Sequence, residues 1–369
     1  MKLHKPDYTH SNLNISATVA EFLGAPNANA TLPQLKAELA KGYEKVVYVL
    51  FDGMGIFPLR QNLPEDDFLR KHIVQELLST FPSTTTCATT SLNTNTLPLE
   101  HGWFGWSVRF ENIGRNVNIF VNTDSWTNEK LEITESPLAK FPYFWDMAHT
   151  DYAINTLMPP FVNITHPEHN VCYTTQAQFF EGLLQLCKKP GKQFVCAYCN
   201  EPDHLMHEVG VTTPQTQRLL KEISQNVQKI AEQCKSTLFI ITADHGQIDV
   251  EGYVYLYQDK KLMEMLVTYP YLEPRAVAFA VKEDQKAQFE EYFRQTYGED
   301  FVLYKSADLV AEGYFGNRGD KAFLLGDYIA VGTYTHKQAI CTPAQPKFLG
   351  HHTGLTEEME VPLILISCP

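Results

Sequence analysis

Three segments of the chain place carboxylates and histidines where an apolar stretch ends. Asp52 lies in LFDGMG, Asp203 and His207 lie in EPDHLMH, and Asp244 and His245 lie in TADHG. Carboxylate oxygens and imidazole nitrogens are ligands of divalent metal ions, zinc above all. A fourth segment, FPSTTTCATTS (81–91), carries five threonines. These indicate a polar edge strand, a capped helix start, or a hydroxyl nucleophile that a base or a metal must activate.

A late GHHTG (350–354) adds two more histidines to this set. Paired metal ions about 4 Å apart serve phosphoryl transfer, because they hold the attacking and the leaving oxygen. Three aspartates would leave two divalent ions with one excess positive charge, which lowers the pKa of a bound hydroxyl and attracts a phosphate. A chain with 30 basic and 43 acidic residues needs such a local positive site to bind an anion.

The first three segments each follow a run that is typical of a buried strand. KVVYVLFDG (45–53), QFVCAYCNEPD (193–203) and TLFIITADHG (237–246) are apolar on both faces, as strands of a covered parallel sheet are. Ligands of open α/β sheets bind outside the carboxyl ends of the strands. We therefore expect the aspartates and histidines to meet at one edge of one sheet.

Helical spacing of apolar residues separates these strands. It predicts helices over 68–81, 175–189 and 213–235, the last of which opens on a threonine cap followed by proline. VPLILIS (361–367) indicates one more buried strand. The pattern predicts an α/β fold with a mostly parallel central sheet and helices on both faces.

Residues 252–345 have a different texture, with two strand-like runs, RAVAFAVK and FVLYKSADLV, on either side of an acidic and basic helix. Because 361–367 returns to the pattern of the first part, we interpret 252–345 as a small inserted α+β subdomain. The catalytic domain is then expected to comprise residues 1–251 and 346–369.

Composition excludes several classes of partner. A formal charge of −13 disfavours nucleic acid polymers and anionic membrane surfaces. The amino terminus has no secretion signal, and no apolar run is long enough to span a membrane, so we expect a soluble cytoplasmic protein. The eight scattered cysteines are interpreted as buried thiols. No pattern sets the oligomeric state.

The motifs occur in an order that resembles a known family. Strand-Asp-Gly (52), Phe-Pro-x-x-Thr (81–85), TNTLPLEHG (94–102), Pro-Asp-x-x-x-His (202–207), Asp-His-Gly (244–246) and a late histidine follow one another in the sequence. This order is similar to that of the nucleotide pyrophosphatase/phosphodiesterase branch of the alkaline phosphatase superfamily. The resemblance implies hydrolysis of a small-molecule phosphodiester or nucleotide on two divalent metal ions, zinc or alternatively manganese.

The resemblance also implies a role for individual residues. Thr85, three residues after Pro82, takes the place of the nucleophile. Its alkoxide is expected to attack phosphorus, and water then hydrolyses the phosphothreonine. The implied ligands of one metal are Asp52, Thr85, Asp244 and His245, and those of the other are Asp203, His207 and His352. His352 is preferred to His351 because the family's last histidine is followed closely by glycine and an apolar strand.

The chain departs from the family where typical members carry an asparagine that holds the phosphoryl group, because Trp106 stands at that position. Trp103 and Trp106 are candidates for a substrate pocket that stacks a flat group, although buried aromatic residues more often form core. No arginine or lysine lies between Thr85 and Arg109, which favours a diester or pyrophosphate over a doubly charged monoester.

Other functions are compatible with parts of the pattern. A phosphatase or a metal-dependent sugar phosphomutase of the same superfamily is the nearest enzymatic alternative. A non-catalytic scaffold is the alternative outside enzymes, but retained ligand-type carboxylates would destabilise a fold without metal. DGMGIFP (52–58) lacks the third glycine of a dinucleotide-binding loop, since Pro58 stands there.

Overall fold

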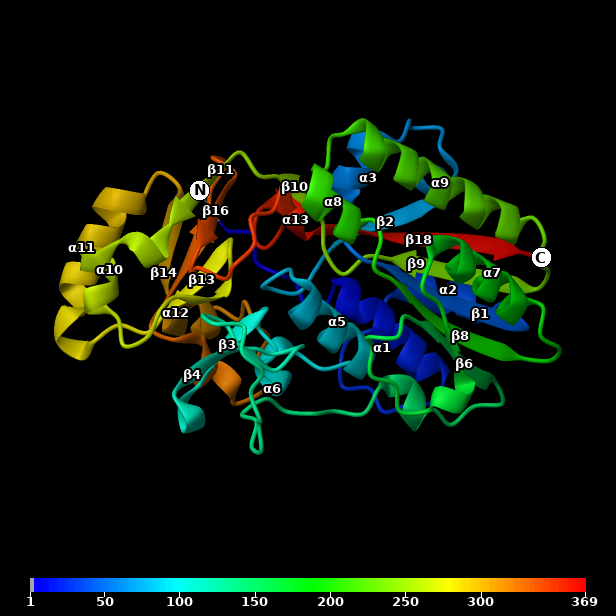
Figure 1. Ribbon diagram of the computed structural model, residues 1–369. Helices are drawn as coiled ribbons and strands as arrows, with labels where there is room; N and C mark the ends of the chain where they lie inside the picture. The colour runs from blue at the N-terminus through cyan, green and yellow to red at the C-terminus, as the bar shows by residue number, and fades with distance from the viewer. Residues whose placement is uncertain (1–2) are drawn as a thin grey trace.

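The computed structural model describes residues 3–369, in which two large β-sheets lie side by side (Figure 1). The first sheet has the strand order β2-β18-β9-β1-β8-β6-β7. Its strands are β1 (Lys45–Phe51), β2 (Ile73–Leu78), β6 (Ala153–Met158), β7 (Asn170–Cys172), β8 (Gln193–Cys199), β9 (Thr237–Thr242) and β18 (Glu360–Cys368). The mixed α/β architecture predicted from the sequence is confirmed.

The three central strands end at the same level. β1 pairs in parallel with β8 and with β9, and the pairing sets Lys45 beside both Gln193 and Thr237. Every residue of β1 is buried, as expected of a strand whose residues after Lys45 are apolar on both faces. Because the strands start in register and have similar lengths, the segments that follow their carboxyl ends emerge at one edge of the sheet.

The prediction for residues 68–81 is wrong. Only Phe68–Lys71 (α4) is helical, and Ile73–Leu78 forms β2, which pairs antiparallel with β18. The exposure of β2 alternates along most of its length, as expected of an edge strand with one covered face. Pairing with β18 therefore overrides the helical spacing of this segment. β18 itself was predicted as a strand, and it runs antiparallel to β9.

Helices cover both faces of the first sheet, with α3 and α9 on one side and α1 and α5 on the other (Figure 1). Two helices fulfil their sequence predictions, α7 (Gln176–Cys187) and α9 (Pro214–Ala231), and Thr213 caps α9 through the N–H of Thr216. The others in this part are α1 (Asn12–Phe22), α2 (Pro33–Leu39), α3 (Ile56–Asn62), α5 (Thr85–Thr94), α6 (Pro98–His101), α8 (Asp203–Val209) and α13 (Thr356–Met359).

The second sheet has the strand order β14-β15-β13-β12-β3-β4-β5. Its strands are β3 (Ser107–Phe110), β4 (Arg115–Asn118), β5 (Thr123–Asp124), β12 (Tyr271–Glu273), β13 (Ala276–Phe279), β14 (Phe301–Lys305) and β15 (Tyr328–Gly332). Helices α10 (Lys260–Met265), α11 (Lys286–Tyr297) and α12 (Ser306–Ala311) belong to the same part of the chain. FVLYKSADLV, expected to be one strand, is divided between β14 and α12.

Strands β3 to β5 come from a region that the sequence pattern assigned to the first domain. They join the second sheet through one antiparallel contact, in which Leu272 of β12 faces Ser107 of β3. A domain centred on the second sheet would therefore include residues 107–124 together with part of 252–345. We propose this modified boundary, because it keeps each sheet with its own hydrophobic core.

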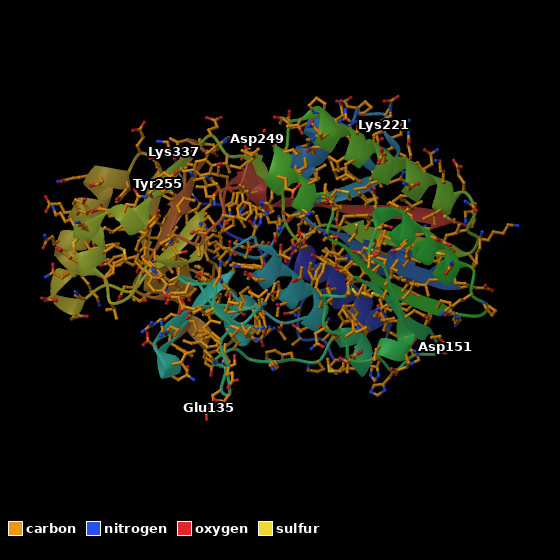
Figure 2. The ribbon with its side chains drawn as sticks, viewed as in Figure 1. Glu135, Asp151, Lys221, Asp249, Tyr255 and Lys337 are labelled. Carbon is orange, nitrogen blue, oxygen red and sulfur yellow. The ribbon has the colours of Figure 1, made fainter. Side chains whose placement is uncertain are left out.

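Two small ladders complete the strands: β10 (Ile248–Asp249) pairs with β17 (Gly350–His351), and β11 (Gly252–Tyr255) pairs with β16 (Lys337–Ile340). Tyr255 and Lys337 mark this second ladder in Figure 2, far from Lys221 of α9. Among residues 3–369, no helix has the length and apolar character needed to cross a membrane.

Candidate metal and phosphoryl-transfer site

The seven residues predicted to act in catalysis or metal binding lie together between the two sheets. Asp52 follows β1, Thr85 is the first residue of α5, and Asp203 is the first residue of α8. Asp244 and His245 follow β9, and His352 follows β17. Because β1, β8 and β9 are parallel and in register, the segments that follow these three strands meet at one edge of the sheet, although they are far apart in the sequence.

One group of ligand-type atoms surrounds the Thr85 hydroxyl. One ligand atom from each of Asp52, Asp244 and His245 lies within 4.8 Å of the other two. Thr85 Oγ1 lies 3.2 Å from His245 Nε2 and 3.4 Å from Asp52 Oδ1. These are the residues expected to share one metal ion, and their spacing fits a common ion.

A second group lies beside the first. His207 Nε2 lies 3.2 Å from Asp203 Oδ2, and His352 Nε2 lies 4.0 Å from Asp203 Oδ1. The rings of His245 and His352 stack with centroids 3.6 Å apart, so the two groups are in contact. The residues predicted for the second metal are thus gathered around one carboxylate.

The three histidines share a hydrogen-bond pattern that prepares them as ligands. Each donates from Nδ1 to a backbone carbonyl: His207 to Gly350 at 2.7 Å, His245 to Gly246 at 2.8 Å, and His352 to Ser83 at 2.9 Å. A proton on Nδ1 leaves the lone pair of Nε2 free. Nε2 is the atom that faces the aspartates in all three, which is the arrangement of metal-binding histidines whose orientation is fixed by an outer hydrogen bond.

Two carboxylate oxygens of the site are buried without a hydrogen-bond partner among the described residues, Asp203 Oδ1 and Asp244 Oδ2. The other oxygen of Asp244 accepts from the N–H groups of Gly53 and His245, both at 3.0 Å. Burying an unpaired carboxylate oxygen is costly unless an ion neutralises it. The donor set of oxygens and imidazole nitrogens therefore fits two divalent cations, zinc or manganese.

Electrostatic coupling within the site agrees with this fit. Burial raises the pKa of Asp244 well above its usual range, and the neighbouring Asp52 raises it further. Burial would lower the pKa of His245, but Asp244 and Asp52 raise it to about 10. Without metal, the imidazole must hold a proton to offset the carboxylates, so protons and metal ions would compete for the same place.

Several residues that the sequence patterns did not single out support the site. Tyr198 of β8 donates its hydroxyl to Asp52 Oδ2, which leaves Oδ1 to face Thr85. Asn12 and Ser79 donate to the backbone carbonyl of Asp244. Tyr198 lies five residues before Asp203, but a tyrosine in a strand has no spacing that marks it as functional. These contacts depend on tertiary structure alone.

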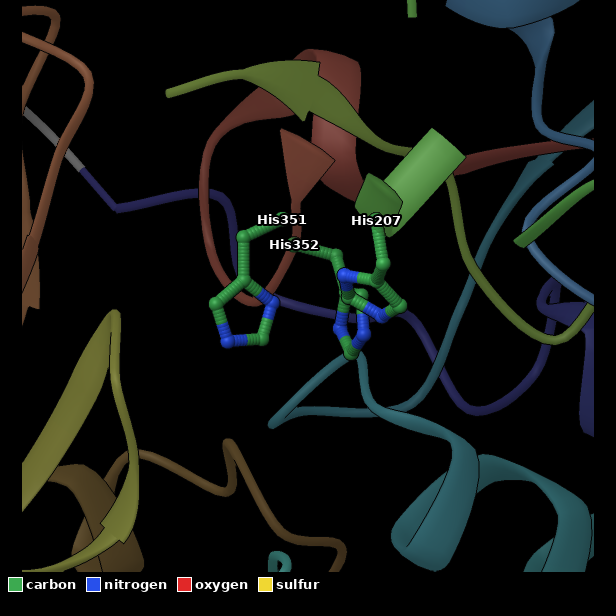
Figure 3. A group of neighbouring side chains, drawn as sticks. All are labelled: His207, His351 and His352. Carbon is green, nitrogen blue, oxygen red and sulfur yellow. The ribbon is translucent and has the colours of Figure 1, made fainter. Parts of the chain in front are cut away.

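His351 is buried next to the site but is arranged differently from His352. Its ring stands to one side of the pair formed by His207 and His352 (Figure 3). Neither of its ring nitrogens has a hydrogen-bond partner within residues 3–369. One of its nitrogens lies within 4.8 Å of nitrogens of both neighbours, so a three-histidine group is also possible by distance. Of these two neighbouring histidines, it is His352 that combines an anchored Nδ1 with an Nε2 facing Asp203.

The aromatic residues predicted to line a pocket lie on the segment that leads from α6 to β3. Trp106 is 45% exposed, and Trp103 is half-buried. The ring centroid of Phe120, which is also exposed, lies 5.8 Å from that of Trp103 and 6.1 Å from that of Trp106. The three rings form an aromatic cluster, which we call the aromatic platform.

Two arginines of the region 252–345 are occupied by other contacts. Arg275 is buried and forms an ion pair with Glu358, with 2.5 Å between Nε and Oε1. Arg318 binds Glu100 and Asn29. Neither guanidinium is therefore available to bind a phosphate without first breaking these contacts.

Comparison with known proteins identifies one family. The family model for type I phosphodiesterase / nucleotide pyrophosphatase matches residues 46–332, which is most of the chain. The match includes β1, the threonine segment, α8 and the segment after β9, but it ends before His352. No curated protein sequence matches the chain.

Solved structures share the fold at low sequence identity. Murine and human ectonucleotide pyrophosphatase / phosphodiesterase 5 are 17% and 18% identical, with a TM-score of 0.62 and 88% of each chain covered. Phosphonoacetate hydrolase from Sinorhizobium meliloti 1021, in complex with phosphonoformate, is 14% identical, with a TM-score of 0.61 and coverage of 89% of this chain and 91% of that one. These likenesses show a common α/β architecture.

Proposed function

The chain belongs to the type I phosphodiesterase / nucleotide pyrophosphatase family and is a hydrolase, and from this premise we propose that it cleaves a phosphodiester or phosphoanhydride bond of a small-molecule substrate through Thr85. The observation that supports this most strongly is the gathering of three aspartates and three histidines at one edge of the first sheet, with Asp52 and His245 beside the Thr85 hydroxyl. A murine relative of the same fold has an inactive threonine-to-alanine variant whose structure contains AMP.

Two divalent ions are part of this proposal. Asp52, Asp244, His245 and Thr85 would hold one ion, and Asp203, His207 and His352 would hold the other. The two unpaired carboxylate oxygens support this assignment because they need a cation. Bound zinc would supply Lewis acidity, which lowers the pKa of the Thr85 hydroxyl and offsets the negative charge of the phosphoryl group.

We infer that Thr85 forms a covalent intermediate. Its oxygen would attack phosphorus in line, and the bond between phosphorus and the leaving oxygen would break with departure of an alcohol or a phosphate. Water would then cleave the bond between phosphorus and the threonine oxygen, which regenerates Thr85 and releases the remaining phosphate ester. Thr85 opens a helix of 10 residues, so N–H groups of the first turn are directed toward the negative charge.

The residues around Thr85 favour a singly charged phosphoryl centre. The guanidinium groups of Arg275 and Arg318 are bound elsewhere, so the second charge of a monoester would lack a side-chain cation from either of them. The aromatic platform offers flat surfaces for a nucleobase or another planar group, with Trp103 and Trp106 as its members from the predicted pocket. The substrate class proposed is therefore a nucleotide-like diester or pyrophosphate.

The cysteines bear on where the enzyme works. All eight are free thiols, and most are buried. Free thiols persist in reducing compartments, so we propose the cytoplasm as the location.

The test compares two chromogenic substrates on zinc-loaded protein, bis(p-nitrophenyl) phosphate and p-nitrophenyl phosphate, at mildly alkaline pH. We expect faster turnover of the diester and its loss in Thr85→Ala. Thr90→Ala is the matched control, because the Thr90 hydroxyl lies on the same helix and donates to the Thr86 carbonyl outside the site. Preference for the monoester would favour a phosphatase or sugar phosphomutase, and wild-type turnover in Thr85→Ala would refute the nucleophile.

A further inference from the structure

A buried carboxylate of the second sheet reaches the start of the nucleophile helix. Glu273, the last residue of β12, is 4% exposed, and its Oε1 accepts two hydrogen bonds. The Thr84 hydroxyl donates at 2.7 Å, and the N–H of Trp106 donates at 2.6 Å. Thr84 is the N-cap of α5 and precedes Thr85 in the chain. One oxygen atom therefore connects the helix start, the aromatic platform and the second sheet.

From this contact we propose that Glu273 is a positioning residue, which fixes Thr85 and the aromatic platform relative to each other. The proposal rests on the proposed function of Thr85. Glu273 itself would touch neither the reacting phosphorus nor the metal ions. It would act through Thr84, whose side chain it holds, and through the Trp106 peptide group.

The strand that carries Glu273 is held by several contacts that do not involve the Glu273 carboxylate. Leu272 pairs with Ser107 across the sheet and donates its N–H to the Ser107 hydroxyl at 3.1 Å. Gly105 packs so closely on this strand that a Cβ atom there would lie 2.9 Å from the Leu272 carbonyl oxygen and 3.1 Å from Glu273 Cγ. The neighbouring Arg275 is anchored by its own ion pair. Removing the carboxylate should therefore release Thr84 and Trp106 while the hairpin stays in place.

A carboxylate at this position carries a cost that an apolar side chain would avoid. Burial raises the pKa of Glu273 to about 7, and the two donated hydrogen bonds only partly oppose that shift. A buried carboxyl is tolerated where its hydrogen bonds fix a specific geometry, and here one donor precedes Thr85 and the other belongs to the aromatic platform.

The contact also has a consequence for substrate binding. Trp106 stands where typical members of the family carry an asparagine side chain that holds the phosphoryl group. Its backbone N–H is bound to Glu273, so this N–H is committed to the protein and does not replace the missing amide. Instead, Glu273 would fix the distance between the aromatic platform and Thr85. The alignment of the leaving group would depend on this distance.

The test uses two substitutions in the full-length, zinc-loaded enzyme with bis(p-nitrophenyl) phosphate. Glu273→Ala removes the shared acceptor, and we expect kcat to fall about 10- to 100-fold, since misplacement by about 1 Å can cost 100-fold. Glu273→Gln keeps a carbonyl oxygen that accepts from both donors, so kcat should stay within about threefold of wild type. Zinc content should be unchanged in both variants, because Glu273 is not a ligand.

A matched control separates positioning from general stability. Tyr271→Phe removes a hydrogen bond of 3.2 Å to the Leu324 carbonyl from the same strand, outside the site. It should lower the melting temperature without changing kcat. Thr84→Val removes the donor at the other end of the contact, and its kcat should also fall about 10- to 100-fold. This variant therefore tests the contact even if Glu273→Ala does not fold.

Amide hydrogen exchange tests the contact without any turnover. The backbone N–H of Trp106 should exchange faster in Glu273→Ala than in wild type and at the wild-type rate in Glu273→Gln. The proposal is overturned if Glu273→Ala or Thr84→Val keeps wild-type kcat, or if Tyr271→Phe loses kcat to the same extent. If wild type hydrolyses neither nitrophenyl ester, the proposed function fails. If the Trp106 N–H exchanges at the same rate in Glu273→Ala as in wild type, the Glu273 contact is excluded independently of turnover.

Discussion

Removal of the metal ions should destabilise the protein by an amount that depends on the unpaired carboxylate oxygens of the site. Asp203 Oδ1 and Asp244 Oδ2 are buried without a hydrogen-bond partner in the described part of the chain. Each such group costs about 1–3 kcal/mol, so the metal-free site carries about 2–6 kcal/mol that bound ions would relieve. With about 2.1 cal/mol/K of unfolding entropy per residue over 369 residues, this corresponds to a melting temperature about 3–8 °C lower.

The substitution Asp244→Asn should remove most of this effect. Its side-chain carbonyl can still accept from the N–H groups of Gly53 and His245, but the buried charge is gone. The raised pKa of Asp244 means that the charged form is disfavoured in the folded protein. At any pH above the ordinary pKa of an aspartate, the unfolded chain is charged at this position, so replacing Asp244 by a neutral residue stabilises the folded state. The metal-free variant should therefore be at least as stable as the metal-free wild type.

The assay is differential scanning calorimetry of zinc-loaded and chelator-treated protein near neutral pH, with metal content measured in parallel. Asp146→Asn is the control, because Asp146 also has a buried oxygen without a partner within residues 3–369 but lies outside the proposed ligands. It should keep the full effect of chelation, whereas Asp244→Asn should lose most of it. A wild-type melting temperature that does not respond to chelation, or a metal-free Asp244→Asn that melts well below metal-free wild type, would refute the reasoning.

Two further predictions concern the segment around the aromatic platform. Burial lowers the pKa of His101 to about 3, so between about pH 6.5 and that value His101 is protonated in the unfolded chain but not in the folded protein. The free energy of unfolding should therefore fall by about 1.4 kcal/mol for each pH unit below about 6.5. Urea unfolding at about pH 7.5 and 5.5 should show a steeper loss in wild type than in His101→Asn, and equal slopes would contradict this. Trp106→Ala should raise KM for bis(p-nitrophenyl) phosphate about 2- to 10-fold, as expected from one lost aromatic contact. Trp126→Ala, in a separate aromatic cluster with Tyr269, should leave KM unchanged.

The sequence predicts the position of the site because the position depends on simple periodicity. Runs that are apolar on both faces identify β1, β8 and β9 as central parallel strands, and parallel strands carry the residues after them to one edge of the sheet. Asp52, Asp203 and Asp244 follow from that rule without any knowledge of loops. Helical spacing of apolar residues is a weaker guide, and it fails for residues 68–81, where pairing with β18 decides the structure.

The supporting residues could not be predicted in this way. Glu273 and Tyr198 are single polar residues in strands, and each acquires its partner only when distant segments meet. Arg275 is a charged residue whose burial against Glu358 could not be read from the sequence. The second sheet gains β3 to β5 through the pairing of β3 with β12, and no local pattern in the sequence predicts that single residue pair.

The stereochemical course at phosphorus tests the central claim most directly, because it reports on the covalent step even when no intermediate accumulates. The substrate would be a chiral phosphorothioate analogue of a nitrophenyl diester, hydrolysed in heavy-oxygen water by the zinc-loaded enzyme. Attack by Thr85 followed by attack of water is two in-line displacements, each of which inverts the configuration, so we predict overall retention. Inversion would show a single direct attack by water and would contradict the assignment of Thr85 as the nucleophile.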